Sequence, residues 1–245
     1  MSIWLALLLL AIFWLLCLIF SLAHRHATLL SGPVLLVTAH PDDESMFFAP
    51  TLLHLHAAGV QTHLLCFSTG NHEGLGSIRQ QELSDAAKRL HLHHICVIDR
   101  PTEFPDDPHQ PWPLSSIVDE VQSTCSLWGI QTVITFDEYG VSGHSNHRAL
   151  SSALRCAQQN YDHTSPLPSI YYLQSLPITQ KYCPIIDAFI SIIISKHQLI
   201  LCTPWHLLTT PYTAMISHWS QMVWFRWFYI LFSVYMYKNV LISSH

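Results

Sequence analysis

Residues 34–44 read Val34-Leu35-Leu36-Val37-Thr38-Ala39-His40-Pro41-Asp42-Asp43-Glu44. The first part of this stretch is a short, continuous apolar run, which is typical of a strand buried on both faces. An imidazole and adjacent carboxylates follow the run at once. In open α/β sheets, ligand sites lie at the carboxyl ends of the strands. The stretch therefore predicts both an α/β fold and the position of its site.

Strand and helix patterns alternate along the rest of the chain. We expect strands over 34–38, 62–68, 95–98, 132–136 and 169–173, with a further apolar run at 187–195. We expect helices over 44–58, 78–92, 114–128 and 146–159. This order predicts a Rossmann-like α/β domain over 33–202, with a mostly parallel sheet and helices on both faces.

The composition narrows the possible functions. Only 11% of the 245 residues are charged, against about 25% in ordinary soluble domains. So few charges indicate that part of the surface contacts lipid or another protein. The net charge is −5 and there is no basic stripe, which argues against a nucleic-acid partner. The seven cysteines are scattered without a C-x-x-C pair, which fits reduced thiols in a cytosolic domain.

The N-terminal segment 1–23 is predicted to be a transmembrane anchor. Residues 3–23 carry no charge and are long enough to cross a hydrocarbon core of roughly 30 Å. The alternative is a cleaved signal peptide, since Ser21-Leu22-Ala23 resembles a cleavage site. The apolar run is longer than usual for such a peptide, and no Lys or Arg precedes it. After a connector over 24–32, with Arg25 as the nearest positive charge, the positive-inside rule places the bulk of the chain in the cytoplasm.

The C-terminal tail, 203–245, is rich in aromatic residues between 219 and 237. Two interpretations of this segment remain open. One is a helix lying in the membrane interface, where Trp and Tyr are favoured. The other is an ordinary helix that packs against the domain.

Nucleotide-binding and serine-hydrolase motifs are missing. Gly74-Leu75-Gly76 lacks the third glycine of a dinucleotide fingerprint, and no P-loop is present. The spacing in Gly140-Val141-Ser142-Gly143 does not match a nucleophile elbow.

A second polar cluster, His144-Ser145-Asn146-His147, follows the strand expected at 132–136. His40 and Asp43 are close enough in sequence to reach one metal ion, and His147 can complete the set. Asp42 then stays free as a general base. His144 can act at the substrate oxygen or protonate the leaving group. Together, the polar clusters at 40–44 and 144–147 predict hydrolysis by a metal-activated water.

Each cluster also has a simpler interpretation. The carboxylates of residues 42–44 would complement the exposed N–H groups of a helix N-terminus. His144 and His147 would merely begin an exposed helix. The occurrence of both clusters at the carboxyl ends of strands favours the metal site.

The motifs Ala39-His40-Pro41-Asp42-Asp43-Glu44 and Gly143-His144-Ser145-Asn146-His147 resemble the LmbE-like / PIG-L family of zinc-dependent N-deacetylases. The resemblance implies zinc (Zn2+) at His40, Asp43 and His147, with Asp42 as general base. It implies that His144 polarises the carbonyl or stabilises the oxyanion. Because His and carboxylate ligands also accept other divalent ions, the resident metal is left open.

The resemblance extends over nearly the whole chain, through residues 66–71, 104–108, 133–137, 173–175, 218–221 and 224–226. It is strongest to the eukaryotic members that deacetylate a glycosylated phosphatidylinositol early in glycosylphosphatidylinositol-anchor synthesis. It implies a single-pass protein of the endoplasmic reticulum membrane with its catalytic domain facing the cytoplasm. The alternatives are a deacetylase of another N-acetyl sugar conjugate and a catalytically silent membrane scaffold.

Four more residues are candidates for substrate binding. Arg79 matches a family arginine near the phosphoinositol, with a solvated helix residue as the alternative. Asn71 and Asp137 follow strands and are expected to line the pocket. His218 is expected to contact substrate, with a packed tail histidine as the alternative. Glu44 is expected to orient a neighbour.

Overall fold

The computed structural model describes residues 15, 30, 32–159, 168–184, 186–187, 190 and 199–243. Within these ranges, no helix combines the length and apolar character needed to span a bilayer. The anchor expected over 1–23 lies outside the described residues apart from Leu15, and it stays a prediction.

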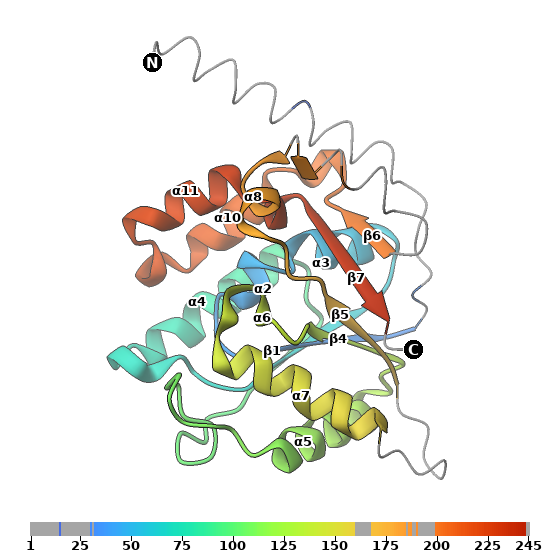
Figure 1. The fold of residues 1–245 in the computed structure, drawn as a ribbon, viewed down its shortest axis with the longest axis vertical. Helices are drawn as coiled ribbons and strands as arrows, with labels where there is room; N and C mark the ends of the chain where they lie inside the picture. Colours follow the sequence, from blue (N-terminus) through green and yellow to red (C-terminus); the bar gives the residue numbers. More distant parts are fainter. Residues whose placement is uncertain are drawn as a thin grey trace.

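A seven-stranded sheet forms the centre of the fold, in the order β3-β2-β1-β4-β5-β7-β6 (Figure 1). The strands are β1 Val34–Thr38, β2 Thr62–Cys66, β3 His94–Val97, β4 Thr132–Phe136, β5 Ser169–Leu173, β6 Leu199–Cys202 and β7 Lys238–Ser243. The pairs from β3 to β5 are parallel, and β7 runs antiparallel to both of its neighbours. The predicted mostly parallel α/β sheet is confirmed.

Helices cover both faces of the sheet (Figure 1). On one face lie α3 Ala49–Ala57, α4 Gly76–Arg89 and α10 Thr210–Ser217, with α4 packed against α10. On the other face, α5 Leu114–Trp128 packs against α7 Ser145–Gln159. The first half of the sheet thus has its crossover helices on one side and the second half on the other, as in doubly wound folds.

The single helix expected over 44–58 is two helices, α2 Asp43–Met46 and α3. The break falls at Phe47 and Phe48, just before Pro50. Proline has no N–H to donate to the carbonyl four residues earlier, so it fits in a first turn but not in a helix interior. The chain therefore stops one helix and starts another with Pro50 in its first turn.

The segment 203–245, predicted to be a C-terminal tail that either packs against the domain or lies in the membrane interface, contributes β7 to the sheet. Ile242 pairs with Tyr172 of β5, and Val240 pairs with Ile200 of β6. The buried Asn239 side chain joins β7 to the α3 region: its Oδ1 accepts from Thr51, and its Nδ2 donates to the Phe47 carbonyl. Much of the predicted tail thus belongs to the sheet domain.

The strand expected over 187–195 is wrong at the two of its residues that are described. Asp187 and Ile190 are helical, and the Asp187 N–H donates to the Cys183 carbonyl. The Asp187 carboxylate turns inward, where it pairs with the buried Lys238 ammonium. The other residues of that run lie outside the described part of the chain.

Short elements complete the fold, and several lie near the carboxyl ends of the strands. They are η1 Asn71–Glu73, α6 Gly140–Gly143, α8 Ile178–Lys181, η3 Trp205–Leu207, η4 Trp219–Gln221, α11 Trp224–Phe232 and η5 Val234–Met236.

Candidate metal centre

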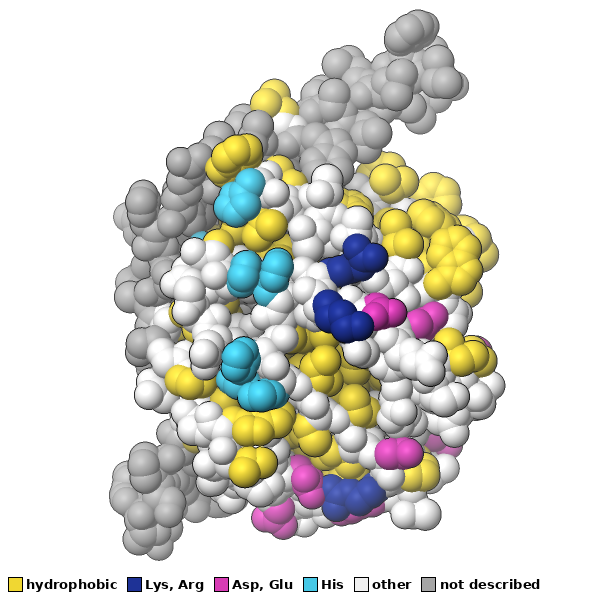
Figure 2. Space-filling model, turned by 180° about the vertical axis from the view of Figure 1, so that it is seen from behind, with side chains coloured by type: hydrophobic (Ala, Val, Ile, Leu, Met, Phe, Trp, Pro, Cys, Tyr) yellow, Lys and Arg dark blue, Asp and Glu magenta, His cyan; other side chains and the backbone are white. Residues whose placement is uncertain are grey.

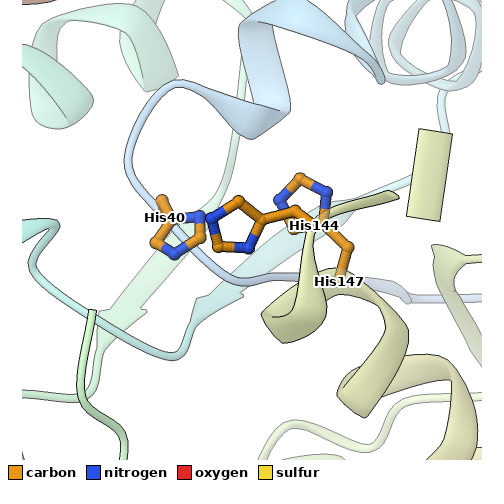
Figure 3. A group of neighbouring side chains, drawn as sticks. All are labelled: His40, His144 and His147. Atoms are coloured by element: carbon orange, nitrogen blue, oxygen red, sulfur yellow. The ribbon is translucent and has the colours of Figure 1, made fainter. Parts of the chain in front are cut away.

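Three imidazoles meet at the carboxyl ends of β1 and β4, the point where the strand order reverses and where open α/β sheets bind ligands. His40 follows β1, while His144 and His147 come from the start of α7 (Figure 3). The ring centroid of His40 lies 4.8 Å from that of His144 and 5.6 Å from that of His147. The two sequence clusters therefore form one site.

His147 directs its Nε2 towards the centre of the site. Its Nδ1 donates to the Gly140 carbonyl at 3.0 Å, so in the neutral ring Nε2 carries the lone pair. The ring stacks on Phe136 at a centroid distance of 4.0 Å. Nε2 is buried without a hydrogen-bond donor among the described residues, and it faces Asp43 Oδ1 at 3.2 Å. An orphaned lone pair held in place by an outer carbonyl is the arrangement of a metal-ligating histidine.

Asp43 supplies the facing oxygen. Its Oδ2 accepts from the backbone N–H groups of Ala39 at 3.0 Å and His40 at 2.9 Å, so Oδ1 is left for the site. Burial acts to raise the pKa of this carboxyl, but the charges and hydrogen bonds of His147 and His40 outweigh it and hold the pKa well below its usual range. Asp43 is therefore an anion in the folded protein.

His40 is oriented by a carboxylate on its far side. Its Nε2 lies 3.1 Å from Asp106 Oδ1, and its Nδ1 lies 3.8 Å from Asp43 Oδ2. Burial acts to raise the pKa of Asp106, but His40 and neighbouring donors lower it to about 2. An ionised carboxylate that accepts from the outer nitrogen frees the inner nitrogen to bind a metal. The sequence analysis assigned Asp106 no role, although the residue lies in one of the quoted stretches.

These donors fit a divalent metal ion. The three imidazoles each offer a nitrogen within 4.8 Å of the others. Two ligand atoms about 2.1 Å from a tetrahedral ion are themselves about 3.4 Å apart, close to the 3.2 Å between Asp43 Oδ1 and His147 Nε2. The group within reach of one ion is thus His40, His144 and His147, with Asp43 Oδ1 facing His147; the ligand set His40, Asp43 and His147 stays a prediction.

His144 is a neutral hydrogen-bond donor. Its Nδ1 accepts from the Asn146 N–H at 3.3 Å, so the ring proton resides on Nε2. Burial, together with the neighbouring His40 and His147, lowers the pKa of His144 to about 4. A neutral imidazole of this kind stabilises negative charge that develops on a carbonyl oxygen.

Asp42 lies in the cavity wall, clamped by two guanidinium groups. Its φ of 111° is in the left-handed region, a strained conformation that non-glycine residues adopt mostly at functional sites. Arg226 Nη1 donates to Oδ2 at 2.8 Å, and Arg79 Nη2 lies 3.5 Å from Oδ1. The Asp42 N–H donates to Glu44. The sequence analysis missed Arg226 because only the folded chain brings α11 over this loop.

A cavity of about 620 Å³ opens over these residues. Its polar wall includes His40, Asp42, Asp43, His144 and His147. Its remaining wall comes largely from α2, α8 and α11, including Lys181, Tyr182, Trp224, Phe225, Arg226, Phe228 and Tyr229. The site therefore joins a polar reaction centre to an aromatic mouth.

The model of one protein family, described as PIG-L: GlcNAc-PI de-N-acetylase, matches residues 35–158. The chain belongs to the PIG-L family. A bovine relative named N-acetylglucosaminyl-phosphatidylinositol de-N-acetylase is 42% identical over 212 residues, covering 84% of this chain and 81% of the relative. A Schizosaccharomyces pombe protein with the same name, qualified as probable, is 34% identical and is covered over 85% of both chains. The N,N'-diacetylchitobiose deacetylase of Pyrococcus horikoshii shares the fold, with a TM-score of 0.61 and 15% identity over 86% of this chain and 83% of that one.

Two of the residues that the PIG-L resemblance implied for substrate binding lie near the cavity. Arg79 lines it, but it is buried and donates to the carbonyls of Gly70 at 3.0 Å and Pro41 at 2.6 Å, so it is not a solvated helix residue. Asn71 is exposed, accepts from the Gly76 N–H at 2.9 Å, and lines a neighbouring cavity of about 260 Å³. Arg79 therefore fixes the loop that carries Asp42, and Asn71 fixes the start of α4.

Asp137 and His218 lie outside the lining of the main cavity. Asp137 accepts from the N–H groups of Gly140 and Ser175, and so positions the carbonyl that holds His147. His218 is fully buried with Nε2 2.7 Å from Glu44 Oε1. Burial opposes its charge, but Glu44 outweighs burial and raises the pKa of His218. In this structure both residues act through neighbours, and Glu44 orients the Asp42 backbone as expected.

Proposed function

We propose that this PIG-L family member hydrolyses the acetamide of N-acetylglucosaminyl-phosphatidylinositol, an early step of glycosylphosphatidylinositol-anchor synthesis. The relatives' names support the substrate. The observation that carries the chemistry is the pair of facing lone pairs on Asp43 and His147, in a cavity that also contains Asp42 and His144. Amide hydrolysis by an activated water requires metal ligands, a general base that is not itself a ligand, and a hydrogen-bond donor for the carbonyl oxygen.

His40, Asp43 and His147 would hold the ion. The donor set suits zinc, although other divalent ions also bind His and carboxylate ligands. When bound, the ion supplies Lewis acidity that polarises the acetamide carbonyl and makes water a better nucleophile at neutral pH.

Side chains of the protein transfer the proton and stabilise the developing charge. Asp42 accepts a proton from the attacking water as the water oxygen bonds to the acetyl carbon. His144 donates a hydrogen bond from Nε2–H to the carbonyl oxygen as negative charge develops there. Asp42 then returns the proton to the amine nitrogen as the C–N bond breaks, which yields acetate and a free glucosamine amine. Arg226 and Arg79 hold the Asp42 carboxylate in place for both transfers.

The aromatic mouth supports action at a membrane. Trp224 is 75% exposed and Phe228 is 58% exposed, and both line the cavity. Figure 2 shows exposed hydrophobic side chains gathered in a patch at its upper right, on the side where α11 lies. Exposed Trp and Phe on one helix favour the headgroup boundary of a bilayer. Together with the uncharged segment 3–23, this supports contact with a membrane. We propose from the family resemblance, and from Arg25 by the positive-inside rule, that the membrane is that of the endoplasmic reticulum and that the catalytic domain faces the cytoplasm.

Acetate release tests the proposal directly. The full chain, in vesicles that contain N-acetylglucosaminyl-phosphatidylinositol, should release acetate, lose that activity to a chelator and regain it with zinc. Deacetylation of N,N'-diacetylchitobiose with no release from the glycolipid would instead favour another N-acetyl sugar as substrate. Full activity in metal-free protein would refute the metal assignment.

A further inference from the structure

Lys181 is a cation on the wall of the reaction cavity that has no ion-pair partner among the described residues. It ends α8, and the cavity that holds the metal donors also contains its side chain. Its Nζ lies 5.4 Å from the ring centroid of Tyr229, 5.6 Å from those of Tyr182 and Tyr235, and 6.0 Å from that of Phe47. Within the part of the chain that the structure describes, no carboxylate forms an ion pair with it.

The other charged groups in the cavity wall are matched with one another. Arg79 contacts Asp42 and Asp106, and Arg226 contacts Asp42. Asp43 faces two imidazoles. Among the described residues of this wall, Lys181 is thus the cation that has no anionic partner. The aromatic side chains around its ammonium group contact it only through their ring faces.

Holding an ammonium in this environment has a cost. Burial lowers the pKa of Lys181 to about 8, because ring faces replace only part of the lost hydration. A desolvated charge in a cavity that lacks a counter-ion strongly attracts an anionic ligand, and such groups cluster at functional sites. We therefore expect the anionic partner of Lys181 to be a group of the bound ligand.

The aromatic neighbours also limit which anion fits. Tyr229, whose ring Lys181 faces, lies one turn after Arg226 in α11, and Lys181 and Arg226 line the same cavity as the metal donors and the aromatic residues of the mouth. Arg226 uses Nη1 for Asp42 and retains further guanidinium N–H groups. We expect a ligand anion that binds both cations to lie between the polar reaction centre and the aromatic mouth, because the same cavity wall includes both. That is where a phosphodiester lies in a molecule with a sugar at one end and acyl chains at the other.

We propose that Lys181, assisted by Arg226, binds the phosphodiester of the substrate. This inference rests on the proposed function and adds a specificity-determining residue to it. Lys181 selects a glycosylated phosphatidylinositol over an uncharged N-acetylglucosamine conjugate, since the phosphodiester carries one negative charge and the uncharged conjugate carries none.

Two soluble probes that differ in the phosphodiester test this without membrane effects. They are N-acetylglucosaminyl-inositol and its glycerophosphodiester, the deacylated form of the glycolipid. Wild-type protein should prefer the phosphodiester in kcat/KM, mainly through KM. Lys181→Met should reduce this preference about ten- to hundredfold, the usual effect of losing a charge-assisted contact. Lys181→Arg should retain most of it.

The matched control is Lys88→Met, which removes an exposed lysine paired with Asp85 outside the cavity. It should keep the wild-type preference. If Lys181→Met keeps the preference as well, or if wild-type protein treats the two probes alike, the phosphodiester role is wrong while the proposed function stands. If wild-type protein deacetylates neither probe nor the intact glycolipid, the proposed function fails and the inference fails with it.

Discussion

Asp43 Oδ1 and His147 Nε2 face each other at 3.2 Å, although the hydrogen bond from His147 Nδ1 to Gly140 makes both facing atoms acceptors. Two facing lone pairs need a cation between them, either a proton or a metal ion. Burial opposes a proton on His147, but Asp43 outweighs burial and raises the pKa of His147 above its usual value. In the metal-free protein Asp43 therefore favours a proton on His147 Nε2, at the place where the ion would bind.

Metal binding should release that proton. We expect proton release below the raised pKa of His147, because ligands must be deprotonated to bind. Since the pKa of His147 is raised, the bound proton persists to higher pH and metal affinity should fall as the pH drops below that pKa. Calorimetric titration with zinc in buffers of different ionisation enthalpy measures the proton count. Binding without proton release at any pH from 6 to 8, roughly the range in which a histidine titrates, would contradict the pairing.

Gly140→Ala should weaken metal binding. A Cβ at Gly140 would lie 2.8 Å from His147 Cβ, and the residue has a φ of +61°. Gly129→Ala is the matched control, because its φ is +62° but nothing lies within 4 Å of the added Cβ. Both variants carry similar backbone strain, and only the first displaces His147. We expect metal affinity to fall about tenfold or more in Gly140→Ala alone. Equal affinities in the two variants would show that His147 does not need this support.

Asp42→Asn should separate catalysis from metal binding. The substitution keeps the shape of the side chain but removes the proton acceptor, so acetate release should fall by roughly two to four orders of magnitude. Bound zinc should stay near the wild-type level. In contrast, His40→Ala, Asp43→Ala and His147→Ala should each lose both metal and activity. Turnover of Asp42→Asn close to wild type, with zinc retained, would remove Asp42 from the mechanism.

The pH dependence of kcat/KM for the phosphodiester probe should report the protonation state of Lys181. Its pKa of about 8 means that the ammonium loses its charge as the pH rises above 8, so kcat/KM for the phosphodiester probe should fall there. The facing groups Tyr182, Tyr229 and Tyr235 have raised pKa values from burial and stay neutral in this range. Lys181→Arg should remove this fall because arginine stays charged. A fall that is unchanged in Lys181→Arg would belong to another group.

His218→Gln should affect stability rather than substrate binding. The imidazole is fully buried against Glu44, and breaking a buried charged pair costs about 3–5 kcal/mol of unfolding free energy. Since the folded-state pKa of His218 is raised, the contribution of the pair is complete below about pH 6.5 and is lost as the pH rises through the folded-state value. Denaturant unfolding at several pH values measures this. A raised KM with unchanged stability would instead restore the substrate-binding role.

Local patterns were enough to predict β1, β4 and the clusters that follow them. β1 is an apolar run that ends at Thr38, and β4 combines Val133, Ile134 and Phe136 with two threonines. Residues that follow parallel strands lie at the same edge of the sheet. The parallel order from β3 to β5 and the meeting of His40 with His147 follow from that rule. The helix break before Pro50 was missed, because the apolar pattern over 44–58 continues through it, although the missing N–H of a proline is a sequence feature that disfavours a helix interior.

Other features depend on contacts that no local pattern contains. β7 begins with Lys238 and Asn239, polar residues that become buried only because Asp187 and the α3 region provide partners. Asp137 looked like a pocket residue because it follows a strand, yet neighbouring N–H groups occupy its oxygens. Arg226 and Lys181 reach the cavity from elements far along the chain from the first metal ligands. Their roles come from the tertiary fold.

The insertion of β7 between β5 and β6 has a consequence for biosynthesis. During translation, β6 has no hydrogen-bonding neighbour in the sheet until the stretch ending at Ser243 has left the ribosome. Premature stop codons upstream of Lys238 would leave the edge of β5 bare and β6 detached, and unpaired strand edges promote aggregation. Quality control should therefore remove such shortened products even though every metal ligand has already been synthesised.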